Sequence, residues 1–167
     1  MSITSTSLLT KAQVTPGEKI PTLTVKETNP GETITLDLKG KNIIIGVPGA
    51  FTPPCSSQVP GYIEKYDEFK AKGVNNIYVV AVNDAFVTKA WKEKLAPNGT
   101  SVRFIGDDQG LLVGSLGLLQ DATGLLGNPR SKRFAIVADE GAVSSLTIEE
   151  DSSTVVSTAA DKILAVL

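Results

Sequence analysis

The sequence contains no histidine and only one cysteine, and these two shortages exclude several kinds of site. Without an imidazole, the Cys/His and Ser/His/Asp arrangements that activate nucleophiles cannot form, and almost all zinc sites are excluded as well. A single cysteine cannot form a disulfide within the chain, so we expect a reducing compartment. If Cys55 is reactive, a group other than histidine must activate it.

The chain also lacks an excess of positive charge, a long apolar run and a secretory signal. Its 16 basic and 18 acidic residues give a net charge of −2, which argues against nucleic acids and anionic membranes as partners. Apolar runs such as NIIIGV are too short to span a bilayer, and no basic start with an apolar core opens the sequence. The last three residues match a peroxisomal address only loosely. We therefore expect a cytoplasmic protein, with the peroxisome and the mitochondrion as less favoured compartments.

No internal repeat and no low-complexity linker divides the 167 residues. A chain of this length can bury a sizeable core as one unit. We therefore predict a single domain over residues 1–167, in which residues 1–15 form a mobile N-terminal tail.

Several short patterns predict the elements of an α/β domain. The alternating segments TLTVKE (22–27) and TITLDL (33–38) indicate an edge hairpin around an Asn-Pro-Gly turn. The apolar run 42–47 is typical of a strand buried on both faces, and residues 59–73 have the spacing of an amphipathic helix. Strand-helix patterns follow over 77–95 and 102–116. Successive βα units of this kind indicate parallel strands.

The C-terminal third has a different order of elements. Residues 133–138 and 142–148 predict two strands joined at Glu140-Gly141, and Thr158 is expected to cap a last helix. The complete order matches the thioredoxin-like fold, with a central mixed sheet and helices on both faces. Periodicity alone indicates only an α/β protein, so the name of the fold depends on the cysteine motif described next.

The stretch PGAFTPPC, Pro48 to Cys55, lies between the predicted buried strand and the first predicted helix. This position brings the sulfur near free backbone N–H groups at the positive end of a helix, which favours the thiolate. Pro53 and Pro54 restrict the backbone before the cysteine. The alternative is a structural cysteine, because free cysteine is often buried as a small apolar side chain. Polar neighbours favour the reactive interpretation.

The pattern Pro-x-x-x-Thr-x-x-Cys in this stretch resembles the active-site signature of the peroxiredoxins. The blocks VPGAFTPPCSSQVPGY, VVAVNDAFVTKAW and RSKRFAIV, with the last helix, resemble the peroxiredoxin-5-like branch of fungal peroxisomal-membrane-protein-20 type. The resemblance covers nearly everything after about residue 20. It implies the thioredoxin-like fold and a one-cysteine peroxidase.

The resemblance also implies roles for four residues. Cys55 corresponds to the cysteine that attacks peroxide, and Thr52 to the hydroxyl that hydrogen-bonds the thiolate and the peroxide. Pro48 corresponds to the ring that shields the thiolate from water, and Arg133 to the arginine that holds the thiolate and the peroxide oxygens. Arg130 is the main competitor for this last role, because it lies three residues away.

Two features depart from the family pattern. Pro54 has no N–H to offer a bound peroxide, and the histidine usual a few residues after the cysteine is missing. Between the last two elements, the apolar segment GLLQDATGLLGN resembles the lining of the family's substrate pocket. We assign Leu125 and Leu126 as candidate contacts for an alkyl hydroperoxide, although any given leucine more often packs into the core.

The resemblance implies a thiol peroxidase that reduces hydrogen peroxide and alkyl hydroperoxides through a sulfenic acid, without a cofactor or a metal. Because no second cysteine can resolve that acid, an external thiol must complete the cycle. The family uses thioredoxin, or glutaredoxin with glutathione, and its members are often homodimers. A redox sensor or holdase chaperone that uses Cys55 is the alternative function. Thioredoxin-like disulfide exchange is disfavoured because a Cys-x-x-Cys pair is absent.

Overall fold

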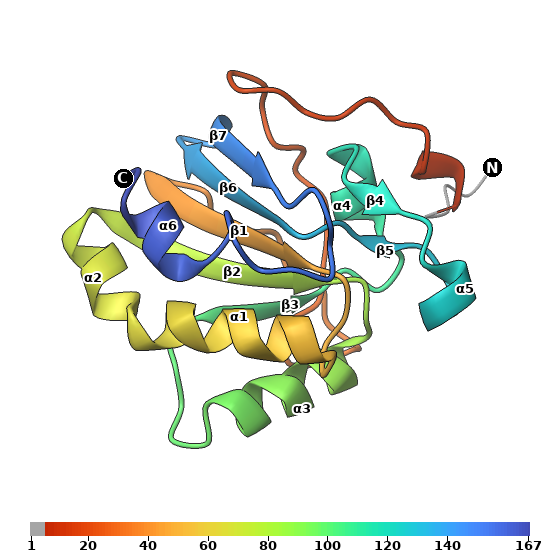
Figure 1. The fold of residues 1–167 in the computed structure, drawn as a ribbon, viewed down its shortest axis with the longest axis horizontal. Coiled ribbons are helices and arrows are strands. Elements are labelled where there is room, and N and C mark those ends of the chain that lie inside the picture. The colour runs from red at the N-terminus through yellow and green to blue at the C-terminus, as the bar shows by residue number, and fades with distance from the viewer. Residues whose placement is uncertain (1–5) are drawn as a thin grey trace.

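A five-stranded mixed sheet forms the centre of the computed structural model, which describes residues 6–167 (Figure 1). The strand order is β3-β2-β1-β6-β7, in which β1, β2 and β3 are parallel and β6 and β7 are antiparallel to their neighbours. The strands are β1 (Lys41–Val47), β2 (Val74–Ala81), β3 (Arg103–Gly106), β6 (Phe134–Asp139) and β7 (Ala142–Ile148). A separate antiparallel ladder joins β4 (Leu119–Gln120) to β5 (Arg130–Ser131).

Helices cover both faces of the sheet, as the sequence predicts (Figure 1). One face packs against α1 (Pro53–Glu64), α2 (Tyr66–Ala71), α3 (Ala85–Leu95) and α6 (Ala160–Leu164). The other face packs against α4 (Leu111–Ser115) and the N-terminal segment, which begins with a 3-10 helix (Thr6–Leu8). The short α5 (Thr123–Leu126) lies outside these layers, next to β5. None of the helices in the described part of the chain is long and apolar enough to cross a membrane.

Strand β1 lies between β2 and β6 at the centre of the sheet, which explains its unbroken apolar sequence. Ile43 and Ile45 belong to the core under α1, whereas Ile44 belongs to the core under α4. Gly46 has no side chain because the ring of Phe134 occupies that space, and a Cβ there would lie 2.0 Å from the ring. The strand therefore ends in a closely packed region directly before the cysteine loop.

The predicted edge hairpin over residues 22–27 and 33–38 is wrong as a pair of regular strands. The two segments share one antiparallel bridge, between Val25 and Ile34. The neighbouring Lys26 bridges Gly106 of β3 instead, and Glu27 forms an ion pair with Arg103. These contacts attach the segment to the edge of the sheet, so tertiary contacts replace the local pairing that alternation suggests.

Two further expectations need correction. Residues 1–5 of the expected mobile tail lie outside the described residues, but the tail prediction fails from Leu8 onward, because Leu8 and Val14 pack on the core next to α4. The Val14 N–H also donates to the Leu116 carbonyl (2.9 Å). The predicted helix over 59–73 begins earlier, at Pro53, and is divided at Lys65 into α1 and α2.

Candidate active site

The loop between β1 and α1 places Cys55 in the first turn of α1. Thr52 precedes the helix in an extended conformation, and Phe51 has a positive φ of 67°, which is uncommon for a residue other than glycine. Pro53 and Pro54 occupy the first two helical positions, where the absence of an N–H costs little. The sulfur therefore lies at the positive end of the helix dipole, as the sequence predicts.

The side chain of Cys55 is fully buried, with 0% of its surface exposed, and it belongs to the core under α1. The polar neighbours of Cys55 do not share its environment, because the helix exposes Ser57 and turns the cysteine inward. The burial is nevertheless not purely apolar. Arg133 donates a hydrogen bond from Nη2 to Cys55 Sγ at 3.2 Å.

Arg133 begins the sequence that leads into β6 and is 1% exposed. Its Nη1 donates to Gln58 Oε1 (2.6 Å), and its Nε donates to the Ser152 carbonyl (3.0 Å). Between residues 6 and 167 no carboxylate forms an ion pair with this guanidinium. A buried cation without an anionic partner is unfavourable. A thiolate at Cys55 would be such a partner, because Arg133 Nη2 already donates to this sulfur.

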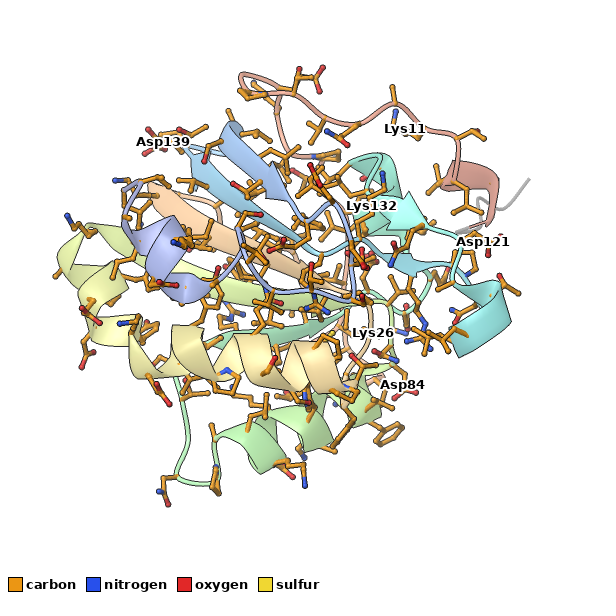
Figure 2. The ribbon with its side chains drawn as sticks, in the orientation of Figure 1. Lys11, Lys26, Asp84, Asp121, Lys132 and Asp139 are labelled. Atoms are coloured by element: carbon orange, nitrogen blue, oxygen red, sulfur yellow. The ribbon has the colours of Figure 1, made fainter. Side chains whose placement is uncertain are left out.

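A pocket of about 340 Å³ opens over this arginine. Its lining residues come from the cysteine loop, from α5 and from the segment after β7: Pro48, Thr52, Pro53, Pro54, Gln120, Ala122, Leu125, Leu126, Arg133, Ser152 and Ser153. Figure 2 shows Asp121 beside α5, where its carboxylate accepts a hydrogen bond from the Thr123 N–H (3.0 Å) at the start of that helix. The pocket therefore brings together five of the sequence-predicted residues: Pro48, Thr52, Arg133, Leu126 and Leu125, the last of which is 87% exposed.

Thr52 and Pro48 lie at the pocket, but neither contacts the sulfur through a hydrogen bond that would define its role. The Thr52 hydroxyl donates to the Gly49 carbonyl (2.9 Å), which leaves the lone pairs of its oxygen free to accept a hydrogen bond from a bound molecule. Pro48 follows the last residue of β1 and is buried. Its carbonyl accepts a hydrogen bond from Arg130 Nη1 (3.3 Å).

Arg130, the competing cation, has a different set of partners. Its guanidinium donates to Asn128 Oδ1 (2.8 Å), the Leu126 carbonyl (3.3 Å) and the Pro48 carbonyl. Burial lowers the pKa of Arg130, and the charge of Cys55 acts in the opposite direction. Arg130 thus braces the loops around the pocket, while Arg133 is the arginine in contact with sulfur.

The sequence analysis misses the residues that hold Arg133. Gln58 follows Cys55 by three positions on the same helix, so helical spacing could have placed both on one face. Ser152 carries no comparable signal, because it reaches Arg133 from a loop 19 residues away in sequence. Its hydroxyl donates to Gln120 Oε1 (3.0 Å), which links the loop to the wall of the pocket.

The predicted capping role of Thr158 is also wrong. The residue before α6 is Ala159, and no side chain caps that helix. The Thr158 hydroxyl donates instead to Glu149 Oε1 (2.9 Å) and accepts a hydrogen bond from Gln58 Nε2 (3.0 Å). A threonine in this position connects the C-terminal segment to the cysteine helix.

Comparisons with known proteins agree with this fold. The Redoxin family model matches residues 15–164. "Peroxisomal membrane associated protein 20" of Schizosaccharomyces pombe is 49% identical over 152 residues, which cover 90% of this chain and 97% of that protein. The structure of reduced Prx3 in complex with H₂O₂ from Vibrio vulnificus has a TM-score of 0.82 and 35% identity, covering 93% of this chain and 100% of that chain. The structure of peroxiredoxin 5 from Alvinella pompejana has a TM-score of 0.82 and 32% identity, covering 91% of this chain and 96% of that chain.

Proposed function

We infer the roles of individual residues from the premise that this chain belongs to the Redoxin family and is a peroxiredoxin, a thiol peroxidase. In the proposed reaction the Cys55 thiolate attacks one oxygen of a hydroperoxide. The S–O bond forms as the O–O bond breaks, and the departing oxygen leaves with the electron pair and takes a proton. The products are a sulfenic acid on Cys55 and water or an alcohol.

Four groups are proposed to assist this displacement. The guanidinium of Arg133 stabilises the thiolate and the negative charge that develops on the departing oxygen. The Thr52 hydroxyl and the Cys55 N–H align the peroxide, and Pro48 excludes water from the sulfur. Pro54 has no N–H to offer the peroxide, so peroxide binding in this chain depends more heavily on the guanidinium of Arg133 than in relatives that have an N–H at this position.

The contact of 3.2 Å between Arg133 Nη2 and Cys55 Sγ is the observation that carries this proposal. Stopped-flow oxidation of reduced protein by hydrogen peroxide tests it, with Cys55→Ser as the unreactive control. We expect saturation by one equivalent of peroxide and a sulfenic acid at Cys55 by mass spectrometry. Equal peroxide consumption by the wild type and the serine variant would overturn the proposal.

We propose that Leu125 and Leu126 on α5 bind the alkyl group of larger hydroperoxides. Both side chains line the pocket above Arg133, and most of the Leu125 side chain is exposed, so packing in the core does not explain it. Leu125→Ser should slow oxidation by cumene hydroperoxide about three- to tenfold, because an apolar contact of this size contributes about 1 kcal/mol. The rate with hydrogen peroxide should stay unchanged, and an equal loss with both peroxides would contradict the assignment.

Peroxide is the substrate and a thiol is the reductant, and we propose thioredoxin, or glutaredoxin with glutathione, as the specific donor. The chain has no second cysteine, so the reductant must attack the oxidised Cys55 directly. Because that side chain is fully buried and does not line the pocket, either thiol requires the first turn of α1 to open before it can reach the sulfur. Turnover of hydrogen peroxide with each donor system in parallel identifies the one that recycles the enzyme.

We propose that the single domain assembles as a homodimer through the surface near the cysteine loop. Phe86 is 69% exposed at the start of α3, and Phe51 is exposed in the cysteine loop. The Asn83 side chain accepts a hydrogen bond from the Ala50 N–H (3.0 Å), which keeps these two regions together. Light scattering of the wild type and of Phe86→Asp should give a dimer and a monomer, respectively.

The cytoplasm is the compartment that we propose, on the sequence grounds given above. The peroxisome is the principal competitor, because the S. pombe relative is named as peroxisomal membrane associated. A fluorescent protein fused to the N-terminus leaves the last residues free. Diffuse fluorescence supports the proposal, and colocalisation with a peroxisomal marker contradicts it.

A further inference from the structure

The segment between β7 and α6, residues 149–158, closes on itself through one carboxylate. Glu149 is 6% exposed, and its Oε1 accepts hydrogen bonds from the Val156 N–H (2.8 Å), the Thr158 N–H (2.7 Å) and the Thr158 hydroxyl (2.9 Å). Burial raises the pKa of Glu149, but the hydrogen bonds from Thr158 and Val156 outweigh burial and keep the pKa below its usual range. An ionised oxygen therefore ties the two ends of this segment together.

The closed segment holds Arg133 from two sides. From the middle of the segment, the Ser152 carbonyl accepts a hydrogen bond from Arg133 Nε (3.0 Å). From its end, Thr158 holds the amide of Gln58, whose Oε1 accepts a hydrogen bond from Arg133 Nη1 (2.6 Å). The remaining nitrogen, Nη2, is directed at Cys55 Sγ.

The direction of these hydrogen bonds follows from the carboxylate. The Thr158 hydroxyl has one proton and gives it to Glu149, so its oxygen can only accept from Gln58. The Thr158 carbonyl, at 3.3 Å, is a second acceptor for the same Gln58 Nε2. Gln58 therefore presents its amide oxygen, not its amide nitrogen, to Arg133. The reversed amide would place a donor against a donor and push the guanidinium away.

We propose that Glu149 and Thr158 are positioning residues for peroxide reduction, which fix the guanidinium of Arg133 relative to Cys55 Sγ through Gln58. This inference rests on the proposed roles of Arg133 and Cys55. The guanidinium is planar and rigid, so a shift at Nη1 also moves Nη2. Misplacement of a reacting group by about 1 Å can cost about 10²-fold in rate.

Thr158→Val tests the proposal because it removes the hydroxyl at nearly constant shape. The carbonyl of residue 158 remains, so we expect partial misplacement and about tenfold slower oxidation of Cys55 by hydrogen peroxide in a single turnover. Thr158→Ser keeps the hydroxyl and should react within about twofold of the wild type. Thr88→Val is the matched control, because Thr88 is also buried and its hydroxyl bonds only to carbonyls at the start of α3. Its rate should not change.

Alkylation by iodoacetamide supplies a second readout, because Cys55 is fully buried and a general loss of stability would speed its alkylation, whereas a misaligned guanidinium would leave the alkylation rate unchanged. This reaction needs the thiolate but no aligned O–O bond, so the ratio of peroxide to alkylation rates should fall about tenfold in Thr158→Val alone. Glu149→Gln keeps an acceptor oxygen without its charge, and its ratio should fall between those of the wild type and Thr158→Val. All rates are measured at 25 °C on protein whose circular dichroism shows that it is folded.

Three results would overturn the inference. The ratio of the peroxide rate to the alkylation rate could stay at its wild-type value in Thr158→Val. It could fall as far in Thr158→Ser as in Thr158→Val, or it could fall equally in Thr88→Val. These results are distinct from a failure of the proposed function, in which wild-type Cys55 itself would not react with peroxide.

Discussion

Replacing Arg133 with lysine or methionine separates its charge from its geometry. Lysine keeps the positive charge but has one ammonium, which cannot replace the Nη1, Nη2 and Nε contacts with Gln58, Cys55 and Ser152. Methionine fills a similar volume and carries neither charge nor donors. The two variants therefore divide the contribution of Arg133 into thiolate stabilisation and alignment of the peroxide.

The magnitude follows from the distance to the sulfur. Unit charges at the 3.2 Å that separates Nη2 and Sγ attract by about 5 kcal/mol at an effective dielectric constant of ~20. Desolvation of both groups offsets part of this attraction. Loss of a donor aimed at the transition state typically costs about 10²–10³ in rate. We expect about 10²-fold slower oxidation for Arg133→Lys and about 10³–10⁴-fold slower oxidation for Arg133→Met at pH 7, because the second variant also loses thiolate.

The assay can use the fluorescence of Trp91, the only tryptophan of the chain. Its indole N–H donates to Ser56 Oγ (3.2 Å), next to Cys55, so oxidation of the sulfur should change its emission. Repeating the stopped-flow series at pH 9 restores thiolate without restoring the donors. Arg133→Met should then recover only part of its rate. Oxidation of Arg133→Lys at the wild-type rate, or full recovery of Arg133→Met at pH 9, would refute the reasoning.

Three other predictions concern the hydroxyl at the pocket, the sheet edge and the packing of the central strand. Thr52→Ala should slow oxidation about 10²–10³-fold with an unchanged melting temperature, whereas Thr52→Ser should stay close to wild type; equal rates in the same stopped-flow assay would contradict the role of the hydroxyl. Hydrogen bonds from Arg103 hold the pKa of Glu27 below its usual range against the effect of burial, so the pair stabilises the fold above about pH 4 and this contribution is lost as the pH falls further. The free energy of unfolding of Glu27→Gln, measured with urea, should therefore be lower by about 1–2 kcal/mol at pH 7 and should depend less on acid pH. An unchanged pH dependence would show that this ion pair does not contribute to stability. Gly46→Ala should lose about 1–3 kcal/mol by the same method because its Cβ would overlap the ring of Phe134, and a neutral effect would mean that the ring can move aside.

The sequence predicts β1 and β2 well because most residues of these two strands are buried on both faces of the sheet. Residues 42–47 form β1, whose bounds are Lys41–Val47, and the strand over 77–82 overlaps β2, whose bounds are Val74–Ala81. For such strands, burial imposes an apolar run that can be read locally. The segments 22–27 and 33–38 alternate as clearly, but Glu27 and Lys26 make their contacts with β3. Local alternation carries no information about such a partner.

The site divides in the same way between local and distant contacts. The motif places Cys55 at the start of α1 and brings Pro48 and Thr52 to the pocket because all three lie within eight residues. The contacts of Arg133 with Ser152 and Gln58 span 19 and 75 residues. Neither the periodicity nor the spacing of the chain encodes them. The polar neighbours of Cys55 likewise do not indicate its burial, since polar residues on a helix can point away from the core.

The partners of Arg133 leave its charge available to the sulfur in a site that has no histidine. Gln58 Oε1 and the Ser152 carbonyl are both neutral, so they orient the guanidinium without cancelling its charge. The nearest carboxylate in the chain of hydrogen bonds, that of Glu149, is separated from it by Thr158 and Gln58. A carboxylate in direct contact would compete with the sulfur for the same cation. With neutral acceptors on two sides, the positive charge remains for Cys55 and, in the proposed reaction, for the peroxide oxygen that departs when the O–O bond breaks.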